Sequence, residues 1–407
     1  MDVDQTRVYL ERSNSSPINV SIDRSDHGLS PCDPFLQIFP HATGRLKSLT
    51  VGVELEYLRD ITAHLSLPAP LLEDLSVHGG IGHLPQHNPT LTSTLFDGDL
   101  SSLRELCLQS VRTKLPWRNM VNLTSFTFAY TSPGEVSIGQ FLDFLESAPR
   151  LRQVQLRSAT PTFGAQNGRR VSLACLKKMD ILGGRPSLLL DHLLIPVGTE
   201  LITHATFPGS LIEDLLPRSL DNLRNLSNFT GIRLYAAGRY TPVEFSGPNG
   251  QVTATWTDTT HFVLEYLPRL DTSKAERLEI DCNETLSRDF AYQTLLLLAS
   301  LRTLAFSHCQ SLYKFIDTLR PSASSSEVVA CPKLEELVLA FHINEGMFDM
   351  KDVIEMAAAR ASRGVGLKSI RIVSNDKVMR TDVLELKKYV LHVECRTDVG
   401  EVGDEED

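Results

Sequence analysis

The chain has 407 residues, a formal net charge of −10 and 42% hydrophobic residues. These values are typical of a soluble globular protein, and the acidic balance predicts no nucleic-acid partner, because such partners select a basic surface. The sequence has no apolar run of about eighteen residues and no C-x-x-C pair among its seven cysteines, so we expect no membrane span and a reducing location, the cytoplasm and/or the nucleus.

The chain opens on a short helix and a strand. Residues 5–12 have a helical pattern, and Pro17–Ile22 alternates apolar and polar residues, which predicts a strand. The chain thus begins inside a repeat pattern without the polar capping unit that a solenoid needs. We expect either a natural segment upstream or a makeshift cap formed by residues 1–16.

An apolar phrase recurs along the chain. Residues 69–77, 148–156 and 331–339 share a small residue, a proline and then the spacing L-x-x-L-x-L with apolar substitutions. This spacing is the signature of a leucine-rich repeat. Eleven units begin at Leu46, Leu72, Leu103, Leu123, Leu151, Leu176, Phe229, Ala275, Leu301, Leu334 and Leu367. Their near-regular order predicts a repeat array and, with it, a binding surface.

Helical stretches precede several of these strands. Residues 138–145, 312–319 and 353–361 carry apolar residues at helical spacing, which gives each a stripe that packs behind the sheet. The sequence therefore predicts an α/β leucine-rich-repeat solenoid, a horseshoe with a parallel sheet on its concave face and helices outside. We expect one array over residues 1–395 and a disordered acidic tail over residues 396–407.

One stretch interrupts the repeats. Asn249-Gly250 lies between two segments of alternating residues, which predicts a hairpin insertion over about residues 238–260. Two alternatives remain for this hairpin, a surface decoration or a flap that contacts a partner.

Candidate chemistry is sparse. His78–His83 with His87 suggests a metal or phosphate site, but the spacing fits no zinc or phosphate motif, so a loop is expected. Asp191-His192 and His308-Cys309 lie in apolar or strand-end contexts, and no G-x-S-x-G elbow is present. We predict no catalytic, metal or cofactor site, and hence no enzyme.

The open face of the sheet is the predicted binding surface. Strand residues that point away from the core are polar and of mixed charge, and arginine and tyrosine are frequent at interface hot spots. The predicted protein-binding residues are Gln153, Gln155, Arg157, Arg233, Tyr235, Arg277, Glu279 and Asp281, and Glu105, Gln109, Lys178 and Asp180 share their orientation. The alternative for each is a solvated strand residue.

The N-terminal segment carries a resemblance. Residues 6–22, with Tyr9-Leu10-Glu11-Arg12-Ser13 and a Ser-rich link to the first strand, resemble the segment after the F-box in proteins of mushroom-forming fungi. The proline-containing repeats are similar to that family too. The resemblance implies repeats that capture a target protein, with an F-box that binds the adaptor of a cullin-RING ubiquitin ligase. The F-box pattern is absent here, and Pro34–Pro40 is only a distant echo of it.

These observations lead to three hypotheses for function. The first is the substrate-binding part of an F-box-type ubiquitin ligase adaptor, whose cullin adaptor would be a partner only if an F-box lies upstream of Met1. The second is a stand-alone repeat scaffold with no link to ubiquitin. The third is a regulator such as a leucine-rich-repeat GTPase activator, which needs an arginine on an ordered loop. The sequence does not identify the target protein.

Overall fold

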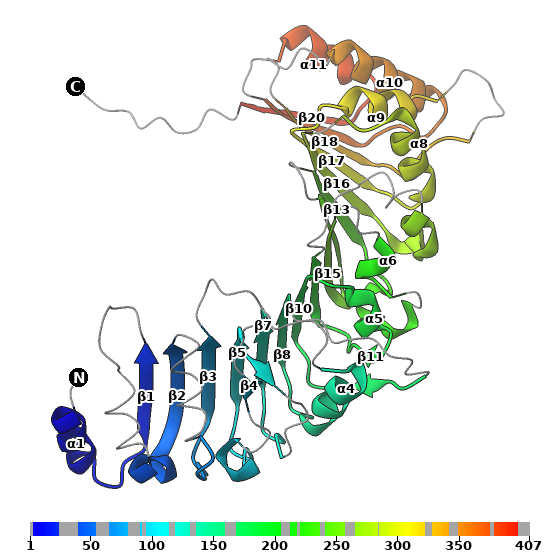
Figure 1. Cartoon of the computed structure of the whole chain (residues 1–407). Helices are drawn as coiled ribbons and strands as arrows, with labels where there is room; N and C mark the ends of the chain where they lie inside the picture. The colour runs from blue at the N-terminus through cyan, green and yellow to red at the C-terminus, as the bar shows by residue number, and fades with distance from the viewer. Residues whose placement is uncertain are drawn as a thin grey trace, which may run out of the picture. The chain divides into compact units, whose positions relative to one another are not determined.

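The computed structural model describes residues 3–23, 40–53, 65–79, 90–91, 95–113, 119–130, 136–158, 168–204, 212–217, 220–236, 241–256, 265–283, 285–321, 328–341, 349–374 and 378–397 (Figure 1). The chain divides into two compact units. Unit 1 is Met1–Thr206 with Glu213–Arg224, and unit 2 is Phe207–Ile212 with Asn225–Asp407. The single array over residues 1–395 stays a prediction.

Unit 1 is built on parallel strands that pair in chain order. They are β1 (Ile18–Asp23), β2 (Leu46–Val53), β3 (Asp74–Gly79), β5 (Glu105–Gln109), β7 (Ser125–Ala129), β8 (Gln153–Arg157), β10 (Lys178–Leu182) and β12 (Glu200–His204). Two further parallel pairs are β4 (Thr90–Leu91) with β6 (Arg112–Thr113), and β9 (Val171–Ser172) with β11 (Leu193–Leu194). Its helices are α1 (Val3–Arg12), α4 (Ile138–Ser147) and α5 (Pro186–Leu190), and α6 (Ile212–Leu215) lies where the chain passes between the units.

Unit 2 combines parallel strands with one hairpin. Its strands are β13 (Gly231–Ala236), β14 (Thr241–Gly247), β15 (Gly250–Trp256), β16 (Arg277–Cys282), β17 (Thr303–Ser307), β18 (Glu336–Phe341), β19 (Ser369–Ser374) and β20 (His392–Thr397). Their order is β15-β14-β13-β16-β17-β18-β19-β20, and all neighbours from β13 through β16 to β20 are parallel. Its helices are α8 (Arg288–Leu297), α9 (Leu312–Leu319), α10 (Met350–Ser362) and α11 (Arg380–Leu386).

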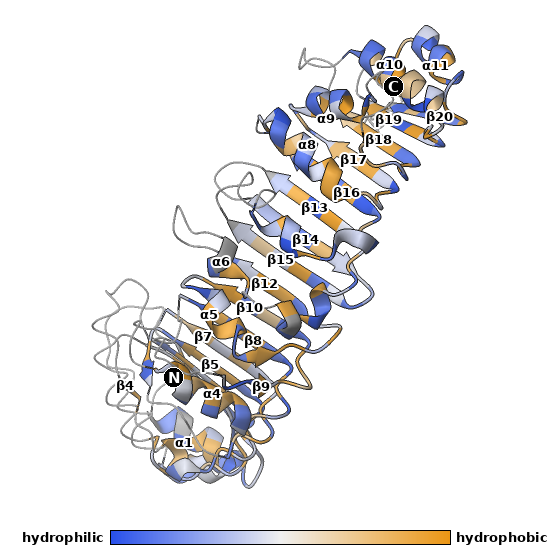
Figure 2. Ribbon diagram, turned by 90° about the vertical axis from the view of Figure 1, so that its right-hand side faces the viewer, coloured by the Kyte–Doolittle hydropathy of each residue, from blue (hydrophilic) through white to orange (hydrophobic). Residues whose placement is uncertain are grey.

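The predicted repeat positions form the core of both units. In all eleven units the three apolar residues of the phrase are buried, with at most 4% of their surface exposed. Successive strand residues point to opposite faces, so these side chains lie on the face that the helices cover, as seen for α4 in unit 1 and for α8 to α10 in unit 2 (Figure 1). They form apolar bands across neighbouring strands in Figure 2. Each unit is therefore an α/β leucine-rich-repeat solenoid, as predicted.

Helix α4 illustrates how a unit closes its core. Ser137 caps the helix in a capping box with Gln140, which satisfies the first free N–H groups. The helix then buries Phe141 and Phe144 against Phe126 of β7, with ring centroids 6.3 and 4.6 Å apart. The predicted helices over residues 5–12, 138–145, 312–319 and 353–361 are all present as α1, α4, α9 and α10.

Neighbouring rungs are joined by main-chain bonds at the residue after the first leucine of the phrase. The carbonyl of Arg104 accepts hydrogen bonds from the N–H groups of Thr124 and Ser125, at 2.8 and 3.0 Å. The same pair of hydrogen bonds to one carbonyl oxygen recurs at Glu73, Thr124, Arg152, Glu276, Arg302 and Glu335. Because these bonds involve only the backbone, they do not depend on which side chain occupies this position.

The predicted hairpin is confirmed, but its setting is not that of a surface decoration. β14 and β15 pair around Pro248–Asn249, with Gly247 opposite Gly250, and Gly250 adopts a φ of 115°, which favours glycine. β14 also pairs with β13, and Phe245 is buried. The hairpin is thus an integral part of the sheet rather than a surface decoration, and contact with a partner through it stays a prediction.

Some predictions fall on other parts of the chain. β20 extends to Thr397, two residues into the predicted acidic tail, and residues 398–407 lie outside the described residues. His83 and His87 lie outside them as well. Within the described ranges, no helix has both the length and the hydrophobicity that crossing a membrane requires.

Candidate functional site

Five of the eight predicted binding residues form one cluster on unit 2. In the β13–β16 register, Arg233 pairs with Glu279 and Tyr235 pairs with Asp281. The Arg233 guanidinium lies 3.0 Å from the Glu279 carboxylate and 4.4 Å from the centroid of the Tyr235 ring. Arg277 lies 3.6 Å from the same carboxylate. We name these five residues the β13 cluster.

The β13 cluster is ordered before any partner arrives. All its members stand on paired strands rather than loops, and the arginine is held from two sides, by an ion pair and by a cation–π contact. The Arg233 and Tyr235 side chains remain half-buried and reach the open face. Little side-chain entropy remains to be lost when a partner binds there.

The other three predicted residues lie on β8 of unit 1. Gln155 donates a hydrogen bond of 3.0 Å to Asp180 on β10, and Arg157 lies 3.9 Å from the same carboxylate oxygen. Gln153 is exposed. The predicted set is therefore two clusters, one in each unit.

A histidine adjoins the cluster on β8. Burial lowers the pKa of His204 on β12, the nearby Asp180 raises it, and Arg157 lowers it further. Burial is the largest of these effects, so the imidazole stays neutral at a pH at which an exposed histidine already begins to gain a proton. The face here thus carries one charged pair beside a neutral ring.

Two further residues of the predicted face, Lys178 and Gln109, have partners on neighbouring strands. Lys178 lies 3.0 Å from Glu200, and Gln109 bonds the ring of His78, whose other nitrogen contacts Ser76. Glu105 is exposed. Lateral contacts of this kind fix the polar face in one arrangement.

The candidate nucleophile residues make structural contacts, whereas the histidine motif is described only at His78. His308 lies 3.5 Å from Asp281, but burial raises the pKa of the adjacent Cys309 thiol to about 12, so it is not a thiolate near neutral pH. His192 bonds the carbonyl of Arg169 at 2.8 Å. Among the described residues, no group of three or more His, Cys, Asp or Glu could hold a metal ion.

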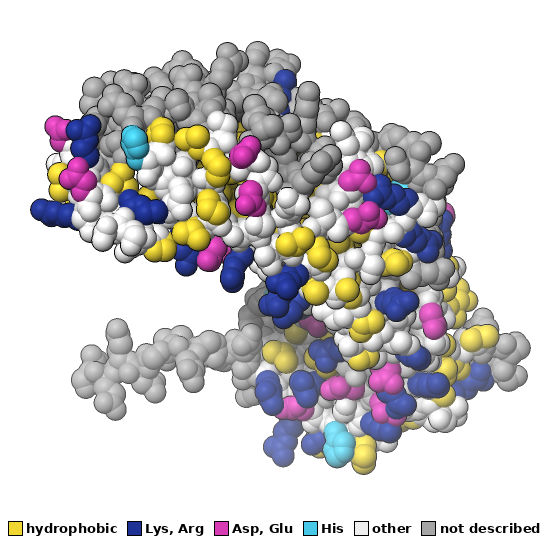
Figure 3. Space-filling view, turned by 90° about the horizontal axis from the view of Figure 1, so that it is seen from below, with side chains coloured by type: hydrophobic (Ala, Val, Ile, Leu, Met, Phe, Trp, Pro, Cys, Tyr) yellow, Lys and Arg dark blue, Asp and Glu magenta, His cyan; other side chains and the backbone are white. Residues whose placement is uncertain are grey.

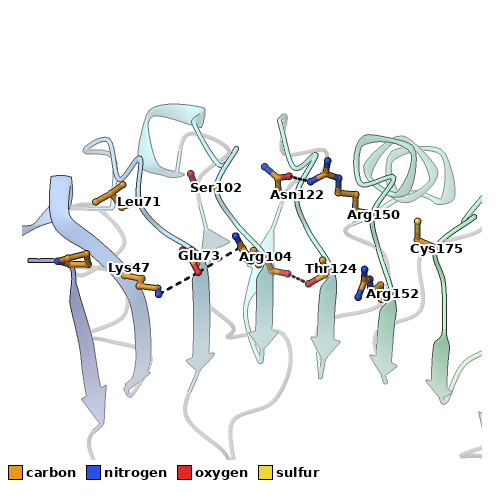
Figure 4. Close-up of a pocket in the computed structure, with 11 residues that line it drawn as sticks. Lys47, Leu71, Glu73, Ser102, Arg104, Asn122, Thr124, Arg150, Arg152 and Cys175 are labelled. Carbon is orange, nitrogen blue, oxygen red and sulfur yellow. Dashed lines mark hydrogen bonds and ion pairs between the residues drawn. The ribbon is translucent and has the colours of Figure 1, made fainter.

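A groove on unit 1 was not predicted. It has a volume of about 630 Å³ and follows the edge at which the strands begin (Figure 4). Two rows of side chains line it, one on each side of the buried first leucines of the phrase. The first row precedes those leucines and the second comes after them; the rows are Leu71, Ser102, Asn122, Arg150 and Cys175, and Lys47, Glu73, Arg104, Thr124 and Arg152, with Pro17 at one end.

The lining of this groove is basic. It contains four cationic side chains and one carboxylate, that of Glu73. Lys and Arg side chains are visible on unit 1 in Figure 3, which views the molecule from the side on which the first strands begin. The repeat spacing is a signal for these positions in the sequence, because every lining residue except Pro17 directly precedes or follows the first leucine of a phrase.

Comparisons with known proteins add little. No family model matches the chain, and no curated protein matches it. Among solved structures, one similar chain comes from the crystal structure of a TLR13–ssRNA13 complex, with 14% identity and a TM-score of 0.36 over 92% of this chain and 52% of that one. The chain thus spans about half the length of that chain, and a similarity of this size says nothing about what it binds.

Proposed function

We propose that this chain recognises a protein partner through the open face of its sheet and positions it without catalysing a reaction. The observation that supports this proposal most directly is the β13 cluster. Arginine and tyrosine are enriched at hot spots, where a few side chains supply most of the binding energy. A site on paired strands also holds such side chains more rigidly than a loop does.

The charges of the cluster favour specificity. Glu279 is shared by Arg233 and Arg277, and its side chain is 20% exposed. A partner must therefore match a fixed pattern of one aromatic ring, two guanidinium groups and two carboxylates. Mismatched charges at such a face cost free energy, which discriminates against wrong partners.

The experiment compares two double variants as baits for partner capture and for affinity measurement. R233A/Y235A removes the arginine and the tyrosine of the cluster. R288A/Y292A removes an exposed arginine and tyrosine from α8, on the helix-covered side, and is the matched control. A partner bound through the open face is lost from the first bait and retained by the second.

For that partner, we expect the dissociation constant to rise about 30-fold in R233A/Y235A, as for one hot spot of about 2 kcal/mol. The control is expected to bind within about twofold of the wild type. Equal affinity of both variants for every captured partner would contradict recognition through this face.

A finer proposal concerns the fate of the captured protein. We propose that it is presented for ubiquitin transfer by other subunits, in the cytoplasm and/or the nucleus. The support for this is the resemblance of residues 6–22 and of the proline-containing repeats to fungal F-box proteins. Recovery of a cullin adaptor with the natural protein, and a longer half-life of the captured partner when the gene is deleted, would support it. A partner with an unchanged half-life and no adaptor would instead favour a stand-alone scaffold.

A further inference from the structure

The groove at the strand-start edge of unit 1 has walls that are fixed before any ligand binds. Ser102 donates a hydrogen bond of 2.6 Å to the carbonyl of Pro70, and Asn122 donates one of 2.7 Å to the carbonyl of Ser101. The Asn122 side-chain oxygen in turn accepts a hydrogen bond from Arg150 at 2.7 Å. This chain of turn-to-turn bonds holds the Arg150 guanidinium at the groove (Figure 4).

The cations of this groove exceed the available carboxylate. Lys47 and Arg104 lie 3.7 and 3.8 Å from the Glu73 carboxylate, which both must share. Arg152 has no ion pair within the described part of the chain. The Arg104 side chain is 64% exposed, so its charge is open to a ligand.

In unit 2, the charges in the row after the first leucines are paired with one another. There, the residues after the first leucines alternate in charge, as Glu276, Arg302, Glu335 and Lys368. Arg302 lies 3.5 Å from Glu276 and 3.2 Å from Glu335, and Lys368 lies 2.8 Å from Glu335. The same backbone position therefore carries a paired ladder in unit 2 and surplus positive charge in unit 1, although the whole chain has a formal net charge of −10.

We propose that this groove binds an acidic, extended peptide segment of a protein partner, whose carboxylates pair with Arg104, Arg150 and Arg152. Guanidinium groups bind carboxylates with directed hydrogen bonds. From Lys47 on β2 to Cys175, just before β10, the groove crosses five strand spacings. At ~4.8 Å per spacing and ~3.3 Å per extended residue, the segment has about seven residues.

The lining favours a peptide over a nucleic acid. Sites for single-stranded nucleic acid combine positive charge with aromatic side chains on which the bases stack. Among the described residues that line this groove there is no aromatic side chain, whereas Leu71 and Pro17 offer apolar contacts at one end. Leu71 is 45% exposed, so an apolar residue of the peptide gains a partner there.

The test uses fluorescein-labelled octaglutamate as the probe and fluorescence anisotropy on the full chain at about 50 mM salt, where surface charges are weakly screened. The groove variant is R104Q/R152Q. The matched control is R302Q/K368Q, which removes two charges at the same repeat position in unit 2, where both are already paired. A third variant, E73Q, removes the competing carboxylate.

We expect the dissociation constant of octaglutamate to rise about tenfold in R104Q/R152Q, equivalent to about 1.4 kcal/mol. The control should stay within about twofold of the wild type, and E73Q should bind about twofold more tightly. Loss of folding cannot explain tighter binding, so the gain expected in E73Q tests the charge balance of the groove independently of the stability of R104Q/R152Q.

Three outcomes would overturn the proposal. One is the absence of octaglutamate binding to the wild type, and another is an equal loss in the two double variants, which would mean attraction to charge in general. The third is tighter binding of a single-stranded oligouridylate than of octaglutamate. R233A/Y235A should keep the affinity for octaglutamate, so failure of the open-face proposal is distinguishable from failure of this one.

Discussion

Arg360 on α10 should be a major source of stability in unit 2. The side chain is fully buried, and its guanidinium donates hydrogen bonds to the carbonyls of Ala330 at 3.0 Å and Cys331 at 2.8 Å, with a longer one of 3.4 Å to Leu319. Burial lowers the pKa of this arginine, and the proximity of the Cys331 thiol raises it. The charge is thus held between the end of α9 and the turn before β18.

The loss of folding free energy in R360M depends on the hydrogen bonds that the two carbonyls lose. In the described part of the chain, no second donor reaches the Ala330 carbonyl, so its loss costs about 1–3 kcal/mol. The Cys331 carbonyl keeps the N–H of Leu334 at 3.1 Å, so its loss is smaller, about 0.5–1 kcal/mol. Relief from burying a charge offsets part of this loss, which leaves a net destabilisation of about 1–3 kcal/mol.

The assay is urea unfolding combined with hydrogen exchange of the amides in α10 and β18. Exchange resolves the local free energy of opening even when the two units unfold separately. The control is K351M on the same helix, whose side chain is 75% exposed and whose ion pair with Glu355 is 3.9 Å long; it should cost at most about 0.5 kcal/mol. If R360M stabilises the protein or matches K351M, the carbonyl bonds of Arg360 are not what holds α10.

Local contacts elsewhere in the chain give three further predictions. Replacing Ser137 by Ala removes the α4 capping box and should destabilise unit 1 by about 1 kcal/mol in urea unfolding, whereas a change under about 0.3 kcal/mol would argue against the cap. The lowered pKa of His204 means that its unfolded state binds a proton more readily, so its contribution to stability is complete above the ordinary pKa of 6.5 and is lost as the pH falls from there toward the folded pKa. An NMR titration midpoint for His204 at or above 6.5 would contradict this. Iodoacetamide at mildly alkaline pH should label the exposed Cys175 in the native protein and spare Cys309 and Cys331. Burial raises the pKa of both of these thiols to about 12, so they are not thiolates at that pH. Mass spectrometry after a short pulse shows which cysteines are labelled.

The repeat fold could be predicted because its core obeys a short-range rule. In a strand, the alternation of side chains places the second and third apolar residues on one face, so a phrase such as Leu334-x-x-Leu337-x-Leu339 specifies strand, register and burial together. β12 escaped this reasoning because Thr203 occupies a core position, where it is fully buried, and only Leu201 keeps the pattern.

Other features depend on contacts that no spacing encodes. Within the helix predicted over residues 353–361, the apolar Ile354 and Ala361 are half-buried, whereas Arg360 is fully buried. The guanidinium can be buried because carbonyls from a distant turn accept its hydrogen bonds. The members of the β13 cluster were identified as outward-facing from alternation alone, yet the stacking of Arg233 on Tyr235 depends on side-chain conformation. The repeat spacing locates the two rows of the groove beside the first leucines, but the sum of their charges depends on several strands lying side by side.

The paired main-chain hydrogen bonds that join most neighbouring rungs have an evolutionary consequence. The amides of the following rung donate hydrogen bonds to a backbone carbonyl, whatever side chain that residue carries. Substitutions at positions such as Arg104 or Glu335 therefore keep these bonds. Natural variation can therefore rewrite the charge along this margin without a cost in folding. Descendants of one ancestral array could in this way acquire different clients while their cores stay the same.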